Sequence, residues 1–123
     1  MIPFMFLRSS TPYGSLTVYF PGMLSAAAMG TGDSIVVTAQ YTLNTGIFID
    51  SISFQVSKDG GAPTQWKQSD FAATESTLQS DTWNSADAGF SGAGTYSFFA
   101  IAKRVSTGAY DLYSTNTILL TVT

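Results

Sequence analysis

Apolar and polar residues alternate along most of this chain with a period of two, as they do in β-strands that bury one face. The longest such run covers residues 34–43, where every second position is apolar: Ile35, Val37, Ala39, Tyr41 and Leu43. Shorter alternating runs lie at 15–20, 51–57, 95–103 and 118–122. With weaker candidates at 65–67 and 77–83, the pattern predicts about seven strands.

Turn-forming residues separate the predicted strands. Pro21-Gly22 ends the first strand, Lys58-Asp59-Gly60-Gly61 follows the third, and Ser106-Thr107-Gly108 precedes the last. Residues 25–32 and 85–94 are rich in Ala, Gly and Ser, and we expect loops there. Short strands with turns between them are typical of a two-layer β-sandwich, and 123 residues are enough for one core.

The chain divides into an N-terminal arm, residues 1–14, and a sandwich domain, residues 15–123. The arm begins with apolar residues and continues through a turn or linker at residues 9–14. No basic stretch precedes the apolar residues, and Pro3 interrupts them. No segment approaches the roughly 18 apolar residues of a membrane span, so we expect neither an export signal nor membrane insertion.

The chain carries little charge. Charged residues make up 11% of it, and the formal net charge is −3 with five scattered basic residues. Nucleic-acid affinity depends on neutralising phosphates, so we expect no nucleic-acid binding. Glu75 is the single glutamate, whereas Ser and Thr together number 32, which favours strands and turns over helices.

The chain contains no His and no Cys. This composition excludes a Ser-His-Asp triad, a thiol nucleophile, a disulfide and a thiolate metal site. Most aspartates lie in or beside predicted turns and are not paired as glycoside hydrolysis requires. Asp81, Asn84 and Asp87 could offer oxygen ligands to calcium, but their spacing matches no EF-hand loop. We therefore predict a protein that is not an enzyme, with no catalytic residues, no cofactor and no metal site.

Residues 94–102, Gly-Thr-Tyr-Ser-Phe-Phe-Ala-Ile-Ala, resemble strand F of immunoglobulin-like domains, in which the tyrosine locks a small-residue corner. By the same resemblance 35–43 is strand B, Phe54 replaces the strand C tryptophan, and 117–123 is strand G. The usual cysteine pair is missing, and Phe98 stands where the second cysteine would be. The resemblance implies an all-β, immunoglobulin-like antiparallel β-sandwich of the disulfide-free type found in bacteriophage structural and bacterial surface proteins.

Both faces of the predicted strand at 95–103 are apolar. Phe98 points to one side and Phe99 and Ile101 to the other, although the outer face of a two-layer sandwich should meet water. Val36 and Leu119 add apolar positions on other strands, and a patch of this kind usually marks a protein interface. We predict an interface made of Ile2, Phe4, Phe6, Leu7, Phe99, Ile101 and Leu119. The alternative is that the arm covers this face within its own subunit.

A small domain without catalytic residues, with an apolar arm and an apolar outer face, is suited to assembly. We expect a non-enzymatic virion structural protein, such as a bacteriophage capsid decoration or cement protein or a minor head or tail protein. It would be assembled in the host cytoplasm and bind capsid or other virion proteins, including copies of itself. The alternative is an adhesive or carbohydrate-binding module of a phage fibre or bacterial surface, with a glycan stacked on Trp66 and Trp83. Aromatic rings in such positions more often cover the open ends of a sandwich core.

Overall fold

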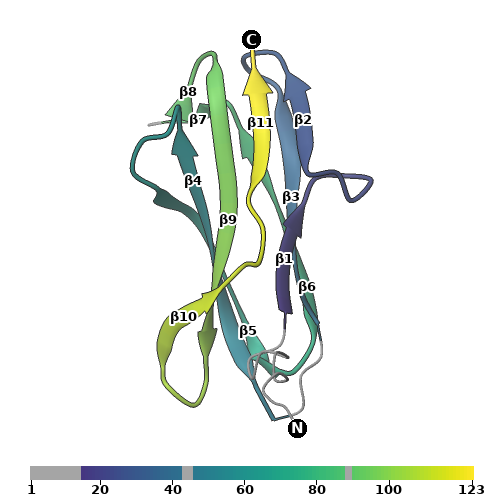
Figure 1. Ribbon diagram of the computed structural model, residues 1–123, viewed down its shortest axis with the longest axis vertical. Helices are drawn as coiled ribbons and strands as arrows, with labels where there is room; N and C mark the ends of the chain where they lie inside the picture. Colours follow the sequence, from purple (N-terminus) through teal and green to yellow (C-terminus); the bar gives the residue numbers. More distant parts are fainter. Residues whose placement is uncertain (1–14, 43–45, 88–89) are drawn as a thin grey trace, which may run out of the picture.

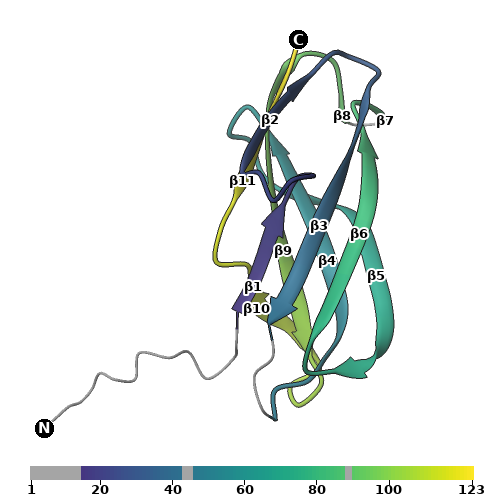
Figure 2. The same ribbon diagram turned by 90° about the vertical axis from the view of Figure 1, so that its right-hand side faces the viewer.

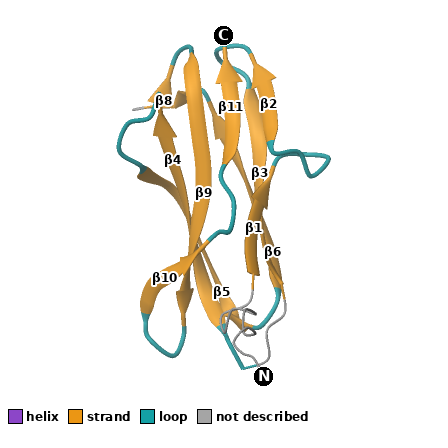
Figure 3. Cartoon of the chain, in the orientation of Figure 1, coloured by secondary structure: helices purple, strands orange, loops and turns teal. Residues whose placement is uncertain are grey.

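The computed structural model describes residues 15–42, 46–87 and 90–123. Figure 3 shows strands and loops, and no helix, in these ranges. Among the described residues, therefore, there is no helix that could cross a membrane. The strands are β1 (Ser15–Tyr19), β2 (Ala26–Met29), β3 (Ser34–Thr42), β4 (Ile49–Lys58), β5 (Thr64–Thr74), β6 (Thr77–Asn84), β7 (Ala86–Asp87), β8 (Phe90–Ser91), β9 (Gly94–Arg104), β10 (Ala109–Tyr113) and β11 (Ile118–Val122).

Two sheets pack face to face as a β-sandwich (Figures 1 and 2). The small sheet has the order β1-β3-β6, and the large sheet has the order β2-β11-β9-β4-β5, with β10 also paired to β9. β7 and β8 form a separate two-stranded ladder. Neighbouring strands are antiparallel except β2 and β11, which are parallel. The predicted all-β, immunoglobulin-like sandwich is confirmed, with β3, β4, β9 and β11 in the places of strands B, C, F and G.

Four segments differ from the sequence prediction. Residues 85–94 were expected to form a loop, but they contain the short strands β7 and β8. Residues 25–32 were expected to form a loop, but they contain β2, which has no apolar–polar alternation because three of its four residues are alanine. Strand β10 follows the predicted turn at 106–108 and went unnoticed because a register shift between Tyr110 and Leu112 interrupts its alternation. Strand β5 extends well beyond the expected 65–67, since its exposed polar residues make an edge strand without a clear period.

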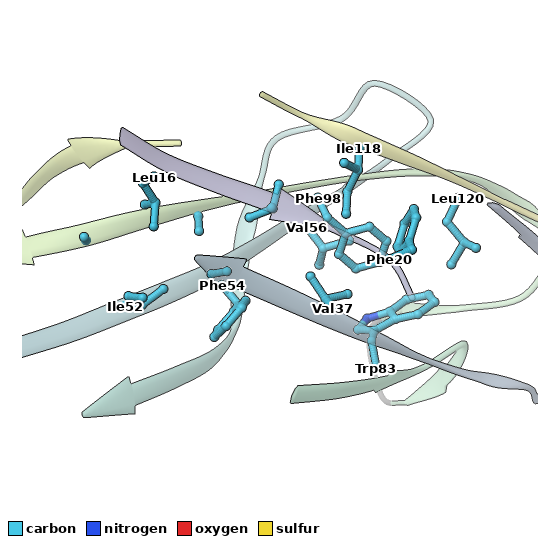
Figure 4. Close-up of a cluster of buried hydrophobic side chains, with 14 of the residues drawn as sticks. Leu16, Phe20, Val37, Ile52, Phe54, Val56, Trp83, Phe98, Ile118 and Leu120 are labelled. Atoms are coloured by element: carbon cyan, nitrogen blue, oxygen red, sulfur yellow. The ribbon is translucent and has the colours of Figure 1, made fainter. Parts of the chain in front are cut away.

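An aromatic cluster around Phe98 forms the centre of the core (Figure 4). The Phe98 ring meets Phe20, Trp66 and Trp83 edge to face, with ring centroids 5.8, 6.2 and 5.2 Å away. Edge-to-face rings add attraction between ring edges and faces to the burial of apolar area. In this chain without cysteines, Phe98 therefore links the two sheets by ring packing, at the position that the resemblance to immunoglobulin-like domains assigns to the second cysteine.

The corner before β9 is closed by a tyrosine, as the resemblance implied. The Tyr96 hydroxyl donates to the Gly92 carbonyl oxygen at 2.9 Å, four residues upstream. Gly94, between them, has a φ of +157°, and a Cβ built there would lie 2.9 Å from Lys58 Cε and 3.0 Å from Asp59 Oδ2. Any larger residue here would have to displace the ends of these two side chains, and Asp59 Oδ1 in turn accepts the Thr95 N–H at 2.9 Å.

The free edge of β1 is closed by a side chain from the linker between β10 and β11. Asn116 Oδ1 accepts the Val18 N–H at 2.9 Å, and Asn116 Nδ2 donates to the Val18 carbonyl oxygen at 2.8 Å. The Thr115 N–H donates to the Leu16 carbonyl oxygen at 2.7 Å. The amide of Asn116 thus substitutes for a neighbouring strand at Val18 and closes the middle of this edge.

Candidate interaction surface on the large sheet

The outer face of β9 carries the candidate surface. Tyr96, Phe98 and Ala100 point into the core and are buried, whereas Phe99 and Ile101 alternate with them, point outward and are half-buried. The strand register places Leu119 of β11 beside Ser97, and Tyr113 of β10 beside Ile101. Phe99, Ile101, Tyr113 and Leu119 therefore lie along one side of the large sheet, and we call these four residues the apolar strip.

Two members of the apolar strip are largely open to solvent. Tyr113 is 61% exposed and Leu119 is 48% exposed. The Tyr113 ring stacks on Phe99, with centroids 6.4 Å apart and ring planes 18° from parallel. The stacking fixes the Tyr113 ring with one face toward Phe99, so an exposed aromatic surface is held in place before anything binds it.

A polar row lies beside the strip, on β4 and β5. Register places Ser53 and Gln55 of β4 opposite Ile101 and Phe99. Ser53 Oγ donates to Gln65 Oε1 at 2.6 Å and accepts from Gln55 Nε2 at 2.7 Å. Although Ser53 points outward, it is buried beneath these longer side chains. The amides of Gln55 and Gln65 consequently form the surface next to the strip.

Ser51 links several side chains at the end of the polar row nearest to β10. Its hydroxyl donates to Asp70 Oδ1 at 2.6 Å and accepts from the Tyr110 hydroxyl, 2.7 Å away on the far side of β9. Hydrogen bonds from Ser51 and then from Gln68 hold the pKa of the Asp70 carboxyl below its usual range, because they stabilise the ionised form. Asp70 is therefore a fixed negative charge at this end of the face.

The other charges near the surface are paired. Lys103 Nζ lies 3.6 Å from Asp50 Oδ1. In the hairpin of β9 and β10, the Arg104 guanidinium donates two hydrogen bonds of 2.8 and 2.7 Å to the Asp111 carboxylate, and these lower the pKa of the Asp111 carboxyl. These charges gather at the β10 end of the face, so the apolar strip itself presents no charged side chain.

The structure brings together some of the predicted interface residues. Phe99, Ile101 and Leu119 share the outer face of the large sheet, as the alternation indicated. Val36 does not join them: it is exposed, but on β3 in the small sheet, on the opposite side of the sandwich. The remaining predicted interface residues lie outside the described residues: Ile2, Phe4, Phe6 and Leu7.

The two tryptophans do not form an exposed platform, because Trp83 lies in the core and Trp66 packs against it. Trp83 is completely buried, and its ring lies 4.7 Å from that of Tyr96. Trp66 is half-buried against Phe54, at 5.5 Å, and against Phe98. The burial of Trp83 corrects the suggestion that a sugar stacks on Trp66 and Trp83 together, and the Trp66 ring packs against rings of its own sheet.

Sequence reasoning missed Tyr113, the most exposed ring of the surface. No element was predicted between the turn at 106–108 and the strand at 118–122, because the register shift in β10 breaks its period. The signal that could have located it is Tyr110, Leu112 and Tyr113 together, a short apolar run directly after a glycine turn.

Two of the three residues considered for calcium, Asp81 and Asn84, make other contacts. Asp81 Oδ1 lies 3.9 Å from Lys67 Nζ, and Asn84 Nδ2 donates to Ser34 Oγ at 2.7 Å. Within the ranges that the structure describes, no three acidic side chains gather around one point. The geometry of these residues gives no reason to place an ion there.

Comparisons with known proteins add little to this picture. No protein-family model matches the chain, and no curated protein matches it either. Among solved structures, the chain is similar to the CARDB domain of the PF1109 protein from Pyrococcus furiosus, solved in complex with di-metal ions. The two are 18% identical with a TM-score of 0.48, over 93% of this chain and 97% of that one. A likeness of this size says nothing about what this chain binds.

Proposed function

We propose that this chain is a non-catalytic assembly protein that binds neighbouring subunits through the apolar strip, as a structural component of a virion. The setting that suits it best is a bacteriophage capsid decoration or cement protein, or a minor head or tail protein. The observation that carries the proposal is the apolar strip: the outer face of the sheet meets water and should be polar, yet it presents aromatic and aliphatic side chains there.

Physical features of the strip favour a protein partner. Binding energy at interfaces concentrates in aromatic residues held in fixed positions, and Tyr113 is held by Phe99. The strip lies over β9, the strand whose core-facing side holds the aromatic cluster, so the contact would rest on a rigid part of the fold. The polar row beside it offers amide and hydroxyl groups for a hydrogen-bonded rim.

The test is the solution mass of the full chain, measured by light scattering over a range of concentrations. We expect an oligomer whose mass falls when Leu119 is replaced, as Leu119→Lys, because a buried lysine charge opposes association. The matched control is Val36→Lys, another exposed apolar strand position on the opposite sheet, which should leave the mass unchanged. A monomer at every concentration, or equal effects of both substitutions, would count against self-assembly through the strip.

A second function is favoured by one specific observation. The exposed Tyr113 ring shares the outer face of the sheet with the amides of the polar row, which lie across β9 from it, and an aromatic ring together with such groups on one face is the chemistry that binds sugar rings. In this glycan-binding alternative Tyr113, and neither tryptophan, is the stacking residue. A glycan array probed with the full chain and with Tyr113→Ala would decide it. Binding that survives Tyr113→Ala would exclude this site.

A further inference from the structure

Most edge strands of the sandwich are protected against pairing with another chain. Asn116 closes β1. On the opposite side β5 and β6 are linked by side chains, since Ser69 Oγ donates to Gln79 Oε1 at 2.8 Å. β10 carries Asp111 and a register shift, two features that discourage strand addition.

Strand β2 has none of these protections. Its four residues are Ala26, Ala27, Ala28 and Met29, without charge, proline or bulge, and β11 is its neighbour on one side only. Figures 1 and 2 show it toward the end of the sandwich that holds the C-terminus. An uncharged and regular edge of this kind is a template for another strand.

The backbone of β2 presents free hydrogen-bonding groups to solvent. The Ser25 and Met29 carbonyl oxygens accept from Leu119 and Thr123 at 3.0 Å, so the odd-numbered residues face β11. Ala26 and Ala28 must then direct their N–H and C=O groups to the open side, because these groups alternate along a strand. Within the described part of the chain, nothing pairs with them.

The surroundings of this edge are apolar and shallow. Ala26 is in register with Leu119, so its methyl group lies on the same outer face as the apolar strip. Met23 and Leu24 are exposed in the loop that leads into β2, and a bridge between Phe20 and Leu24 holds that loop. Small alanines between exposed Leu119 and Leu24 leave room for bulky side chains from an added strand.

We propose that the open edge of β2 accepts residues 2–7 of a neighbouring copy of this chain as an added antiparallel strand. The proposal rests on the proposed assembly function and names the contact that would link one subunit to the next. Strand addition of this kind gains affinity from backbone hydrogen bonds and specificity from alternate side chains. Both are available here, on β2 and in the apolar sequence Ile-Pro-Phe-Met-Phe-Leu.

The arm fits this edge better than a second β2 does. Two β2 strands paired with each other would place alanine against alanine and bury little apolar area. The arm instead offers large side chains at each position of residues 2–7 except Pro3, and no charge before Arg8. Residues 8–14 then provide a connection long enough, at up to about 3.3 Å per residue, to pass between subunits.

Proline fixes the register of the added strand. Pro3 has no N–H, so it must face away from β2, and the even-numbered residues must make the ladder. Phe4 and Phe6 would then pair with Ala28 and Ala26. Residues that pair directly share a face, so both rings would extend the apolar strip beyond Leu119.

The natural absence of cysteine allows a direct test by disulfide trapping in the full chain. Phe4→Cys protein is mixed with Ala28→Cys protein under mild oxidation, and Phe6→Cys protein with Ala26→Cys protein. Directly opposed antiparallel residues have Cα atoms about 5.5 Å apart, within the span of a disulfide. We expect each mixture to give a linked heterodimer on a non-reducing gel. The matched controls are Met5→Cys, whose side chain would lie on the opposite face of the added strand, and Val36→Cys, which lies on the other sheet.

Each outcome bears on the proposal. A higher yield of linked heterodimer from the Phe4 and Phe6 mixtures than from both controls supports it. An equal yield from the Met5 and Phe4 variants overturns the proposed register and the added strand. A chain carrying both Phe4→Cys and Ala28→Cys that closes internally as a monomer, while the mixtures stay unlinked, shows that the subunit's own arm occupies the edge and overturns the neighbouring-copy proposal.

The test also separates this inference from the proposed function. If the mixtures stay unlinked but the chain is an oligomer sensitive to Leu119→Lys, the strand-addition proposal fails and assembly through the strip stands. If the chain is a monomer and no pair links, both fail.

Discussion

Replacing Phe98 should cost this domain more stability than replacing any other phenylalanine whose placement is described. Phe98 is completely buried and meets three rings edge to face. Truncation of a buried phenylalanine to alanine costs about 3–5 kcal/mol. Each edge-to-face pair is worth about 0.5–1.5 kcal/mol beyond its buried area, so three lost pairs place Phe98→Ala near the top of that range. Against the about 5–15 kcal/mol that stabilise a typical domain, this is a large fraction.

The measurement is urea-induced unfolding followed by far-ultraviolet circular dichroism. Tryptophan fluorescence is a poorer signal, because Trp66 and Trp83 both touch Phe98 and would change their emission with the substitution itself. The control is Phe99→Ala, the next residue in the chain, which lies on the outer face and is half-buried; about 1 kcal/mol is expected there. If the two substitutions cost the same, Phe98 is not the centre of the core and the reasoning is refuted.

Three further predictions follow from the same contacts. Asn116→Ala should lower the free energy of unfolding by about 1–3 kcal/mol, because it leaves an N–H and a C=O of β1 without partners; urea unfolding checks it. Gly94→Ala should cost about 1–3 kcal/mol through its φ of +157° and the contact with Asp59, visible as a lower Tm. Arg104 lowers the pKa of the Asp111 carboxyl, so the pair stabilises the fold fully above the ordinary pKa of 3.8, and this stabilisation is lost as the pH falls through the lower pKa of the folded state. Asp111→Asn should therefore flatten the acid part of the plot of stability against pH, and an unchanged plot would contradict this.

The sequence predicts the fold best where one strand face is apolar and the other is polar. β3 and β4 alternate cleanly, because each has one side in the core and one side on a polar surface. β6 shows why the rule fails elsewhere: Leu78 is exposed, while Gln79 and Asp81 point toward β5 and bind Ser69 and Lys67. Polar side chains that close an open side of the sandwich invert the pattern, and a single sequence does not reveal which side is open.

The candidate surface was predictable in part for a related reason. Phe99 and Ile101 stand out because they break the expected polarity of an outer face, and the structure places them there. Tyr113 could not be assigned, since its side depends on the register shift between Tyr110 and Leu112. The sequence left both a sugar platform and a core cover open for the tryptophans, because residue type alone does not distinguish a ring at the rim of a sheet from one between sheets.

The way the sandwich closes its edges links the two proposals. Side-chain amides and ion pairs protect β1 and the β5–β6 side, and these contacts are all between polar groups of the same subunit. At β2 the chain has alanine in place of such groups, next to Leu119 of the apolar strip. An unprotected edge beside an exposed apolar face is a liability for a monomer, because both promote association. A contact that covers the edge and the face together removes both, so we place the strip and the β2 edge in one continuous interface, with Leu119 as the residue they share.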